Sequence, residues 1–206
     1  MSDRLNDRLR VILATRNPGK IREIRYILGS LPIEFVTLND FPHVGAVSED
    51  GLTFEENATK KALHVWEDTR LTSLADDSGL QVDALDGEPG IFSARFAGEH
   101  ASYEDNNRKL LALLCDVPFE KRRARFVCVA ALVVPGGELI LRRGEVEGLI
   151  TDVPAGAGGF GYDPIFYLPS YGKTVAELSD QVKNTVSHRA KAFAGMRQLL
   201  GSMLSK

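Results

Sequence analysis

The stretch VILATRNPGKIREIRYIL, residues 11–28, carries the pattern that decides the fold. Residues 11–14 form an apolar run that is typical of a short buried strand. From Pro18 onward, apolar side chains recur at helical spacing up to Leu28, and Gly29 offers a stop. The stretch therefore predicts a strand that passes directly into a helix, which is the repeating unit of α/β folds.

The rest of the chain repeats this alternation and adds one long hairpin. Periodicity and turn residues predict further strands at 33–38, 73–75, 124–134 and 138–149. They predict further helices at 53–68, 102–114 and 187–203. Because Pro135-Gly136-Gly137 joins two β-rich runs as a hairpin, the expected fold is α/β with a mixed sheet. In such sheets, strand-to-helix crossovers are the usual place for ligands.

Length and composition set the class of protein. The 206 residues suffice for one large domain or two fused lobes, and we expect an extension at 1–9 and one two-lobed domain at 10–206. The net charge of -3 argues against a nucleic-acid partner. No run approaches 18 apolar residues and the first ten are polar, so no membrane span or signal peptide is expected. Cys115 and Cys128 lie in apolar company without ligand-like spacing, which indicates buried thiols in a cytoplasmic protein.

The first candidate site lies where the opening strand meets its helix. Asn17 can cap the helix and Pro18 suits the first helical position. The free N–H groups and partial positive charge of a helix start favour an anion, and Lys20 adds a full charge one turn in. The alternative interpretation is an ordinary capped helix with a surface lysine.

A second candidate site surrounds the start of the helix predicted from Thr53. Asn57 and Lys61 are four residues apart and share one helix face. Acidic residues crowd the helix entry, where they favour the helix dipole in any protein. The more specific hypothesis is that Glu49 binds a metal ion while Lys61 faces phosphate.

Asp76 and Asp77 form the third candidate site, at the end of the strand predicted at 73–75. Adjacent carboxylates repel unless a cation or hydrogen bonds compensate. Oxygen ligands of this kind suit magnesium, which bridges to substrate phosphates. The alternative is an Asx-type turn in which Gly79 takes the unusual dihedral.

Two further segments suggest a base-binding site. Glycines flank Phe160 in residues 158–164, which would free its ring for stacking on a base. Asp163 and Arg189 are candidates for contacting the base edge. The alternatives are a tight turn with Phe160 in the core, and a plain helix cap at residues 187–189.

Taken together, these segments resemble the inosine triphosphate pyrophosphatase family, from Val11 to about Ala192. The matching positions are Thr15-x-Asn17-x-x-Lys20, Glu49 to Phe54, Glu56-Asn57-Ala58, Lys61-Ala62, Ala75 to Leu80, Pro89 to Arg95, Gly159 to Pro164 and Ser187 to Arg189. Each motif alone is weak, but their joint order is specific. One departure is Ser48, where many members carry a glutamate, which leaves Glu49 as the better metal ligand.

The resemblance implies a long, curved, mixed sheet with two lobes flanking an active-site cleft, and a homodimer. It also implies magnesium-dependent hydrolysis of deaminated purine nucleoside triphosphates (ITP, dITP, XTP) between the α and β phosphates. Asp77 would be catalytic, with Asp76 as the alternative, and Glu49 and Asp77 would hold Mg²⁺. The expected substrate-binding residues are Thr15, Arg16, Asn17, Pro18, Gly19, Lys20, Lys61, Ser78, Phe160, Gly161, Tyr162, Asp163, Lys183, His188 and Arg189.

Two rival functions remain. A regulatory module would hold a triphosphate without cutting it, although two carboxylates are poorly suited to binding phosphate alone. A related house-cleaning pyrophosphatase would act on modified pyrimidine or methylated nucleotides instead.

Overall fold

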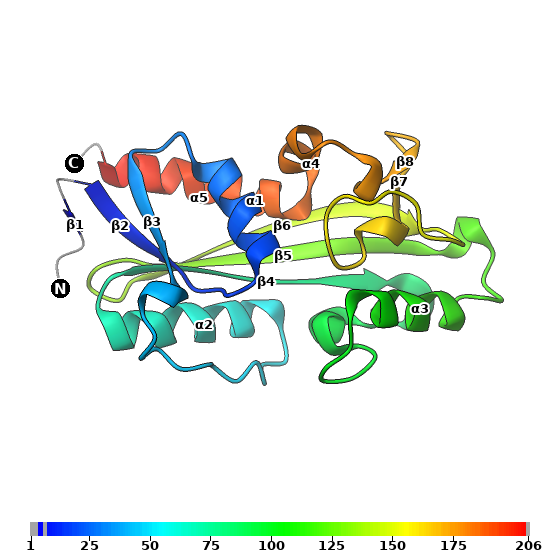
Figure 1. Ribbon diagram of the computed structural model, residues 1–206, viewed down its shortest axis with the longest axis horizontal. Helices are drawn as coiled ribbons and strands as arrows, with labels where there is room; N and C mark the ends of the chain where they lie inside the picture. The colour runs from blue at the N-terminus through cyan, green and yellow to red at the C-terminus, as the bar shows by residue number, and fades with distance from the viewer. Residues whose placement is uncertain (1–3, 6–7, 205–206) are drawn as a thin grey trace. The chain divides into compact units, whose positions relative to one another are not determined.

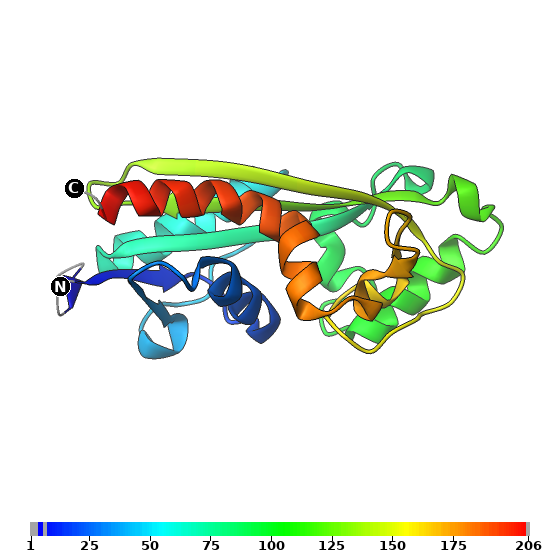
Figure 2. The ribbon, with the colours of Figure 1, turned by 90° about the horizontal axis from the view of Figure 1, so that it is seen from above.

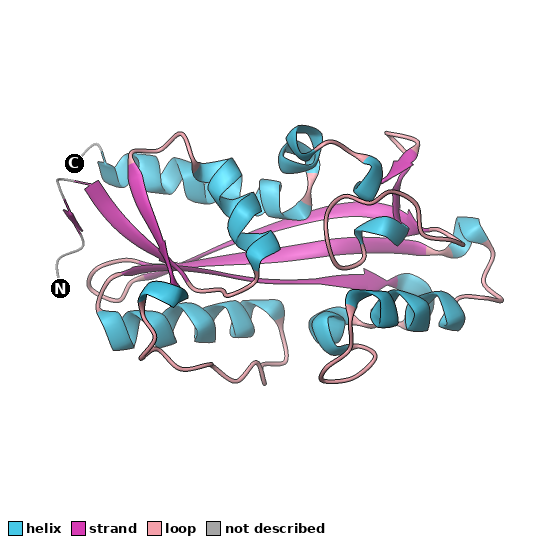
Figure 3. Cartoon of the chain, viewed as in Figure 1, coloured by secondary structure: helices cyan, strands magenta, loops and turns pink. Residues whose placement is uncertain are grey.

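A computed structural model describes residues 4–5 and 8–204 of the chain. Its strands are β1 (Arg4–Leu5), β2 (Arg8–Leu13), β3 (Ile33–Thr37), β4 (Thr72–Val82), β5 (Arg123–Val133), β6 (Leu139–Ile150), β7 (Phe166–Leu168) and β8 (Lys173–Thr174). Its α-helices are α1 (Pro18–Leu28), α2 (Phe54–Thr69), α3 (Tyr103–Leu113), α4 (Asp180–Val186) and α5 (His188–Leu204). The expected α/β class is confirmed (Figure 3).

The strands form a mixed sheet, as expected. Their order is β1-β2-β4-β5-β6-β7-β8, with β3 also paired to β2. The strand β2 runs parallel to β3 and β4, whereas β1 pairs with β2 antiparallel, as do β6 with β7 and β7 with β8. The parallel β2–β4 pair places Leu13 beside Leu74, so the end of β2 lies next to the beginning of β4, just before Asp76 and Asp77.

The chain divides into two compact units. Unit 1 comprises residues 1–77, 128–144 and 189–206, and unit 2 comprises residues 78–127 and 145–188. The three long strands β4, β5 and β6 each begin in one unit and end in the other. The two lobes that the family resemblance implied correspond to these units.

Unit 1 places helices on both faces of its strands. Figure 1 shows α2 on one side of β4 and α1 and α5 on the other, and Figure 2 shows α5 running along the β5–β6 hairpin. The core between α1, α5 and the strands is built from Leu13, Ile24, Leu74, Ala130 and Phe193, all fully buried. The helical spacing that predicted α1 from the sequence is thus the spacing of its buried face.

Unit 2 has its own apolar core. Leu80 of β4, Leu110 of α3, Ile150 of β6 and Phe166 of β7 are all fully buried there. The ring of Phe126 lies 4.3 Å from that of Phe166, centroid to centroid. This core supports the loop that precedes β7, where the second part of the candidate site lies.

Most predicted elements are confirmed, and the differences have physical causes. The strand predicted to end before Asp76 continues as β4 through Gly79 to Val82, so the alternative of an Asx-type turn at Gly79 is wrong. The elements β7, β8 and α4 were missed because they are only 3, 2 and 7 residues long. The predicted helix at 187–203 is confirmed as α5.

The N-terminal boundary also differs. The strand β2 begins at Arg8, and Leu9 belongs to the buried core, so the expected extension at 1–9 includes part of the sheet. Within that extension, β1 pairs with β2, whereas residues 1–3 and 6–7 lie outside the described part of the chain.

One expectation about side chains needs correction. Cys115 is exposed, because it follows α3 on the surface, whereas Cys128 is buried as expected. Arg122 lies in a run of basic residues at 121–125. It is buried, and its guanidinium lies 2.8 Å from the carboxylate of Asp152. Across the described residues, no helix combines the length and apolarity needed to cross a membrane.

Candidate active site

The start of α1 is closed by a side-chain cap. The side-chain oxygen of Asn17 accepts hydrogen bonds from the backbone N–H groups of Gly19 and Lys20, at 2.9 and 3.1 Å. Thr15 accepts from the N–H of Asn17 at 3.2 Å and so fixes the capping residue. Pro18 occupies the first turn, where its missing N–H costs nothing. The cap predicted from the sequence is confirmed.

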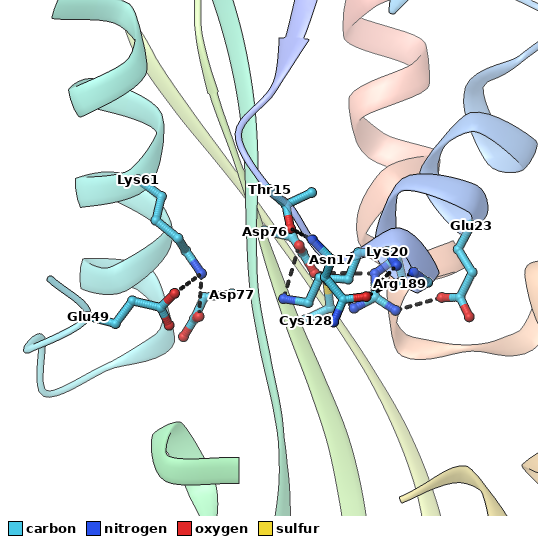
Figure 4. A network of polar contacts seen from close by, with 11 residues as sticks. Thr15, Asn17, Lys20, Glu23, Glu49, Lys61, Asp76, Asp77, Cys128 and Arg189 are labelled. Carbon is cyan, nitrogen blue, oxygen red and sulfur yellow. Dashed lines mark hydrogen bonds and ion pairs between the residues drawn. The ribbon is translucent and has the colours of Figure 1, made fainter. Parts of the chain in front are cut away.

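Asp76 and Asp77 point to opposite faces of β4. Successive side chains of a strand alternate between the two faces, and these residues lie in its middle. Figure 4 shows Asp77 on the side of α2 with Lys61, and Asp76 on the side of α1 with Lys20 and Arg189. The two carboxylates therefore do not repel at close range as the sequence suggested, and each belongs to a separate polar cluster.

On the α2 side, one ammonium group lies between two carboxylates. Lys61 Nζ is 2.6 Å from Asp77 Oδ1 and 3.5 Å from Glu49 Oε1. The side chains of Lys61 and Asp77 are 10% and 7% exposed, whereas that of Glu49 is 40% exposed. Lys61 was expected near the start of α2, but it lies in the middle of this helix. Its side chain faces the cluster rather than open solvent.

Burial and charge act on both members of this pair. Burial disfavours the ammonium form of Lys61, but the charges of Asp77 and Glu49 outweigh burial and raise its pKa above the ordinary value. Burial raises the pKa of Asp77, and the charges of Lys61 and Lys20 offset only part of that increase. A carboxylate with a raised pKa is better matched to accepting a proton near neutral pH.

The loop that carries Glu49 is tied to its surroundings. The N–H of Gly51 donates to the side-chain oxygen of Asn57, at 2.8 Å, and a Cβ at position 51 would collide with that oxygen. Thr53 caps α2 as predicted, but the carboxylate of Glu56 accepts from the N–H of Leu52 rather than from that of Thr53. Asn57 therefore fixes the segment next to Glu49.

Arg16 does not point at the α1 cap. It is exposed and donates to the carbonyl oxygen of Val44, at 3.0 Å, in the loop before Glu49. In this structure Arg16 connects two loops, and its expected role in binding substrate finds no support in that contact.

On the α1 side, four alternating charges form a chain of contacts. Lys20 Nζ lies 3.2 Å from Asp76 Oδ1, and Arg189 Nη2 donates to Asp76 Oδ2 at 2.9 Å. The far side of the same guanidinium donates from Nη1 to Glu23 Oε2 at 2.6 Å. Cys128 Sγ lies 3.9 Å from Asp76 Oδ2. Apart from Lys20, whose side chain is 16% exposed, the charged members are buried.

In this structure Arg189 contacts carboxylates, and its expected role at the base edge stays a prediction. The residue is 2% exposed, and its guanidinium bonds two carboxylates, so it does not present a donor to a base edge. The charges of Asp76 and Glu23 outweigh the effect of burial and raise the pKa of Arg189. Arg189 organises Asp76 instead.

In unit 2, the loop from Gly159 to Asp163 is held from several sides. Asp163 Oδ2 accepts from the N–H of Phe160 at 2.8 Å and forms a buried ion pair with Lys183. A Cβ at Gly159 would collide with that carboxylate, and the backbone there has φ +73°. Asp163 thus orients the loop.

Other contacts anchor the neighbouring residues of this loop. The hydroxyl of Tyr162 donates to the carbonyl oxygen of Ser93 at 2.8 Å, and burial raises the pKa of Tyr162. The side-chain amide of Asn107, on α3, donates to the carbonyl oxygen of Gly161 at 3.1 Å. The backbone around Phe160 is therefore pinned, while its side chain remains partly exposed.

Phe160 lies beside a cation and a second aromatic ring. The ammonium of Lys183 is 4.8 Å from the centroid of its ring, and the ring of Tyr103 is 6.1 Å away at an interplanar angle of 42°. The interpretation of Phe160 as a core residue is wrong, because its ring takes part in a polar and partly exposed cluster.

A small pocket adjoins this loop within unit 2. Its wall is mostly apolar, with Lys183, Asp163 and His188 as its charged or titratable members. The ring of His188 stacks on that of Phe126 at 4.8 Å and 19°. The full lining is Phe126, Val146, Asp163, Leu168, Val175, Leu178, Lys183, Val186, Ser187 and His188.

The remaining expected residues fall on both units. Ser78 directly follows Asp77 in β4 and opens unit 2, and Gly161 has a positive φ of 65° in the anchored loop. The sequence missed Glu23 and Asn107, since a charged or amide residue in a helix reads as a surface residue when its distant partner is unknown. The helical spacing does offer one signal, because Glu23 adjoins Ile24 of the buried face.

The Glu49–Asp77 pair fits a magnesium ion. Both carboxylates lie within 3.5 Å of one ammonium group, Lys61 Nζ. Asp77 belongs to β4, and Glu49 belongs to the loop before α2. Magnesium usually takes one or two carboxylates and completes its shell with water and substrate phosphate. Among the described residues no group of three or more His, Cys, Asp or Glu side chains is placed to hold a metal ion. Glu49 and Asp77 are the residues that would hold the ion.

These features define an α/β protein in which a helix start capped by Asn17 and a buried carboxylate–lysine cluster belong to the same unit. The model of the Ham1 family matches residues 11–199, and the chain belongs to that family. It is 54% identical to a dITP/XTP pyrophosphatase of Geobacter sulfurreducens over 93% of this chain and 96% of the relative. It is 47% identical to a dITP/XTP pyrophosphatase of Desulforamulus reducens over 95% and 97% of the two chains.

Solved structures agree with the fold. The Staphylococcus aureus Ham1 protein is 41% identical with a TM-score of 0.84, covering 94% of this chain and 99% of its own. A nucleoside-triphosphatase/dITP/XTP pyrophosphatase from Mycobacterium abscessus is 44% identical with a TM-score of 0.75, covering 91% and 98%. Family and fold are thus supported by both sequence and structure.

Proposed function

We propose that this protein hydrolyses deaminated purine nucleoside triphosphates (ITP, dITP and XTP) to the monophosphate and pyrophosphate, and so removes them from the nucleotide pool. The observation that carries the proposal is the Lys61–Asp77–Glu49 cluster, in the same unit as the capped start of α1. Cations and N–H donors suit the phosphates, and the carboxylates suit a metal ion and a proton acceptor. Relatives named dITP/XTP pyrophosphatase support the substrate class.

The proposed roles follow from the contacts in unit 1. Thr15, Asn17, Lys20 and Lys61, with the partial positive charge at the start of α1, hold the triphosphate and absorb charge on the leaving pyrophosphate. Asp77 orients the attacking water and accepts its proton, as the new bond to the α phosphorus forms and the bond to the leaving oxygen breaks. When bound by Glu49 and Asp77, magnesium would neutralise phosphate charge and lower the pKa of a bound water.

The proposed base site lies in unit 2. Phe160 offers a ring for stacking, worth about 1–3 kcal/mol without choosing between bases. The ammonium of Lys183 lines the pocket and only donates hydrogen bonds, so it favours the 6-oxo group of hypoxanthine or xanthine over the 6-amino group of adenine. In this proposal Lys183 contacts the base edge, with His188 as its neighbour in the pocket.

A panel of triphosphates tests the proposal. The protein is incubated with ITP, dITP, XTP, ATP, GTP and modified pyrimidine triphosphates, and both pyrophosphate and orthophosphate are measured, with magnesium and with excess chelator. Pyrophosphate release from the deaminated purines, dependent on magnesium, is expected. Orthophosphate and a diphosphate would show that a different bond is cut. Preference for modified pyrimidines would favour the related pyrophosphatase, and binding without products would favour a regulatory module.

The family resemblance also leads us to propose a homodimer in the cytoplasm. Light scattering coupled to size exclusion should give twice the 22.6 kDa chain mass. A monomer across the concentrations used for kinetics would contradict the dimer.

A further inference from the structure

Glu23 is a buried carboxylate to which the sequence assigned no role. It lies on α1, three residues after Lys20, and is 3% exposed. Its Oε2 accepts from Arg189 Nη1 at 2.6 Å. Arg189 in turn bonds Asp76, and Asp76 faces Lys20 at 3.2 Å. Lys20 is thus reached from Glu23 by a chain of three polar contacts (Figure 4).

The charges along this chain balance. Glu23 and Asp76 carry two negative charges, and Arg189 and Lys20 carry two positive charges. Arg189 is the second residue of α5, where the partial positive charge at a helix start disfavours a cation. A buried guanidinium at that place needs compensation from both carboxylates, and Glu23 and Asp76 bond to opposite ends of it.

Of the two carboxylates that bond the guanidinium of Arg189, Asp76 alone would keep its charge if Glu23 lost its own. Its oxygens would be drawn toward Arg189, and Lys20 would lose part of the interaction that fixes its ammonium group. Lys20 is the less buried end of the chain, with a side chain 16% exposed, so it has room to move.

We infer that Glu23 is a positioning residue: acting through Arg189 and Asp76, it fixes the ammonium of Lys20 where the triphosphate binds. This inference rests on the proposed function, because it assumes that Lys20 contacts phosphate. It adds to that function a residue that need not touch the substrate. Misplacement of a binding group by about 1 Å can cost about 100-fold in rate.

A double-mutant cycle separates positioning from a general structural role. The variants are Glu23→Gln, Lys20→Ala and the double variant, and kcat and KM are measured with ITP. Glu23→Gln alone should lower kcat/KM by roughly 10- to 100-fold. In the Lys20→Ala background the same substitution should change kcat/KM by no more than about 2-fold, because the group it positions is gone. The division of the loss between kcat and KM should match that of Lys20→Ala.

Glu34→Gln is the matched control, since Glu34 forms a more exposed pair with Arg10 at 3.4 Å in the same unit. It should leave kcat and KM unchanged. If Glu23→Gln fails to fold, Glu23→Asp keeps the charge, shortens the reach by one methylene and enters the same cycle with the same criterion. An equal loss in both backgrounds would overturn the inference while leaving the proposed function intact. A parent protein that releases no pyrophosphate would overturn both.

Discussion

Two arginine–glutamate contacts in unit 1 have the same length but very different surroundings. Arg189 Nη1 to Glu23 Oε2 and Arg143 Nη1 to Glu55 Oε1 are both 2.6 Å. The first pair has side chains 2% and 4% exposed, and the second has side chains 42% and 37% exposed. Because this distance is matched, replacing each arginine by methionine compares, by the free energy of unfolding, a buried arginine that also bonds Asp76 with an exposed one.

The expected losses differ several-fold. Arg189→Met leaves the buried carboxylates of Glu23 and Asp76 without their shared cation, and removal of one partner from a buried pair costs about 3–5 kcal/mol. Arg143→Met removes a surface pair, which is worth about 0–1 kcal/mol. In a protein of this size about 1 kcal/mol shifts the melting temperature by about 2–4 °C. The expected decreases are therefore about 6–20 °C for Arg189→Met and at most about 4 °C for Arg143→Met.

Thermal and urea unfolding, followed by circular dichroism at equal protein concentration, measure the two losses. Urea data should show a lower midpoint with an unchanged slope, since the exposed surface on unfolding stays the same. Equal losses for the two variants would refute the reasoning. So would a fully stable Arg189→Met protein, because the carboxylates would then not depend on the guanidinium.

Three further predictions concern activity. Asp77→Asn should lower turnover with ITP at least about 100-fold, the scale of a lost general base, and retained turnover would contradict the role of Asp77. Lys61→Ala should lower kcat/KM for ITP strongly and the melting temperature only modestly. Unchanged kinetics would favour a purely structural lysine. Phe160→Ala should lower kcat/KM for ITP and for ATP by the same factor. Lys183→Met should instead lower the ratio of kcat/KM for ITP to kcat/KM for ATP. A ratio that stays constant in Lys183→Met would mean that the base is recognised elsewhere.

Local signals were sufficient for the elements that frame the site. Asn17, Pro18 and the apolar spacing up to Leu28 predicted α1, because caps and helical periodicity depend on neighbours within a few residues. Thr53 predicted the start of α2 for the same reason. The β5–β6 hairpin followed from its glycines, whose φ values of 101° and 85° at Gly136 and Gly137 suit a turn.

Partners distant in the sequence decided what local signals could not. Asp76 and Asp77 suggested the end of a strand, because charged residues rarely occupy a buried strand interior. They are accommodated there by Arg189, 113 residues away from Asp76, and by Lys61, 16 residues away from Asp77. The pairing of Arg189 with Glu23 was missed for the same reason, since the two residues are 166 positions apart. No pattern within one segment indicates such a pairing.

The alternation of β4 divides two chemical tasks between adjacent carboxylates. Asp76 faces a charge-balanced and buried cluster, whose members hold one another in place. Asp77 faces one lysine and the half-exposed Glu49, an arrangement that leaves access for a metal ion and water. Burial raises the pKa of Asp77 toward the range useful to a base, while Asp76 is bound twice by a guanidinium. The structure therefore favours Asp77 over Asp76 as the reactive carboxylate, a choice that their adjacent positions in the sequence left open.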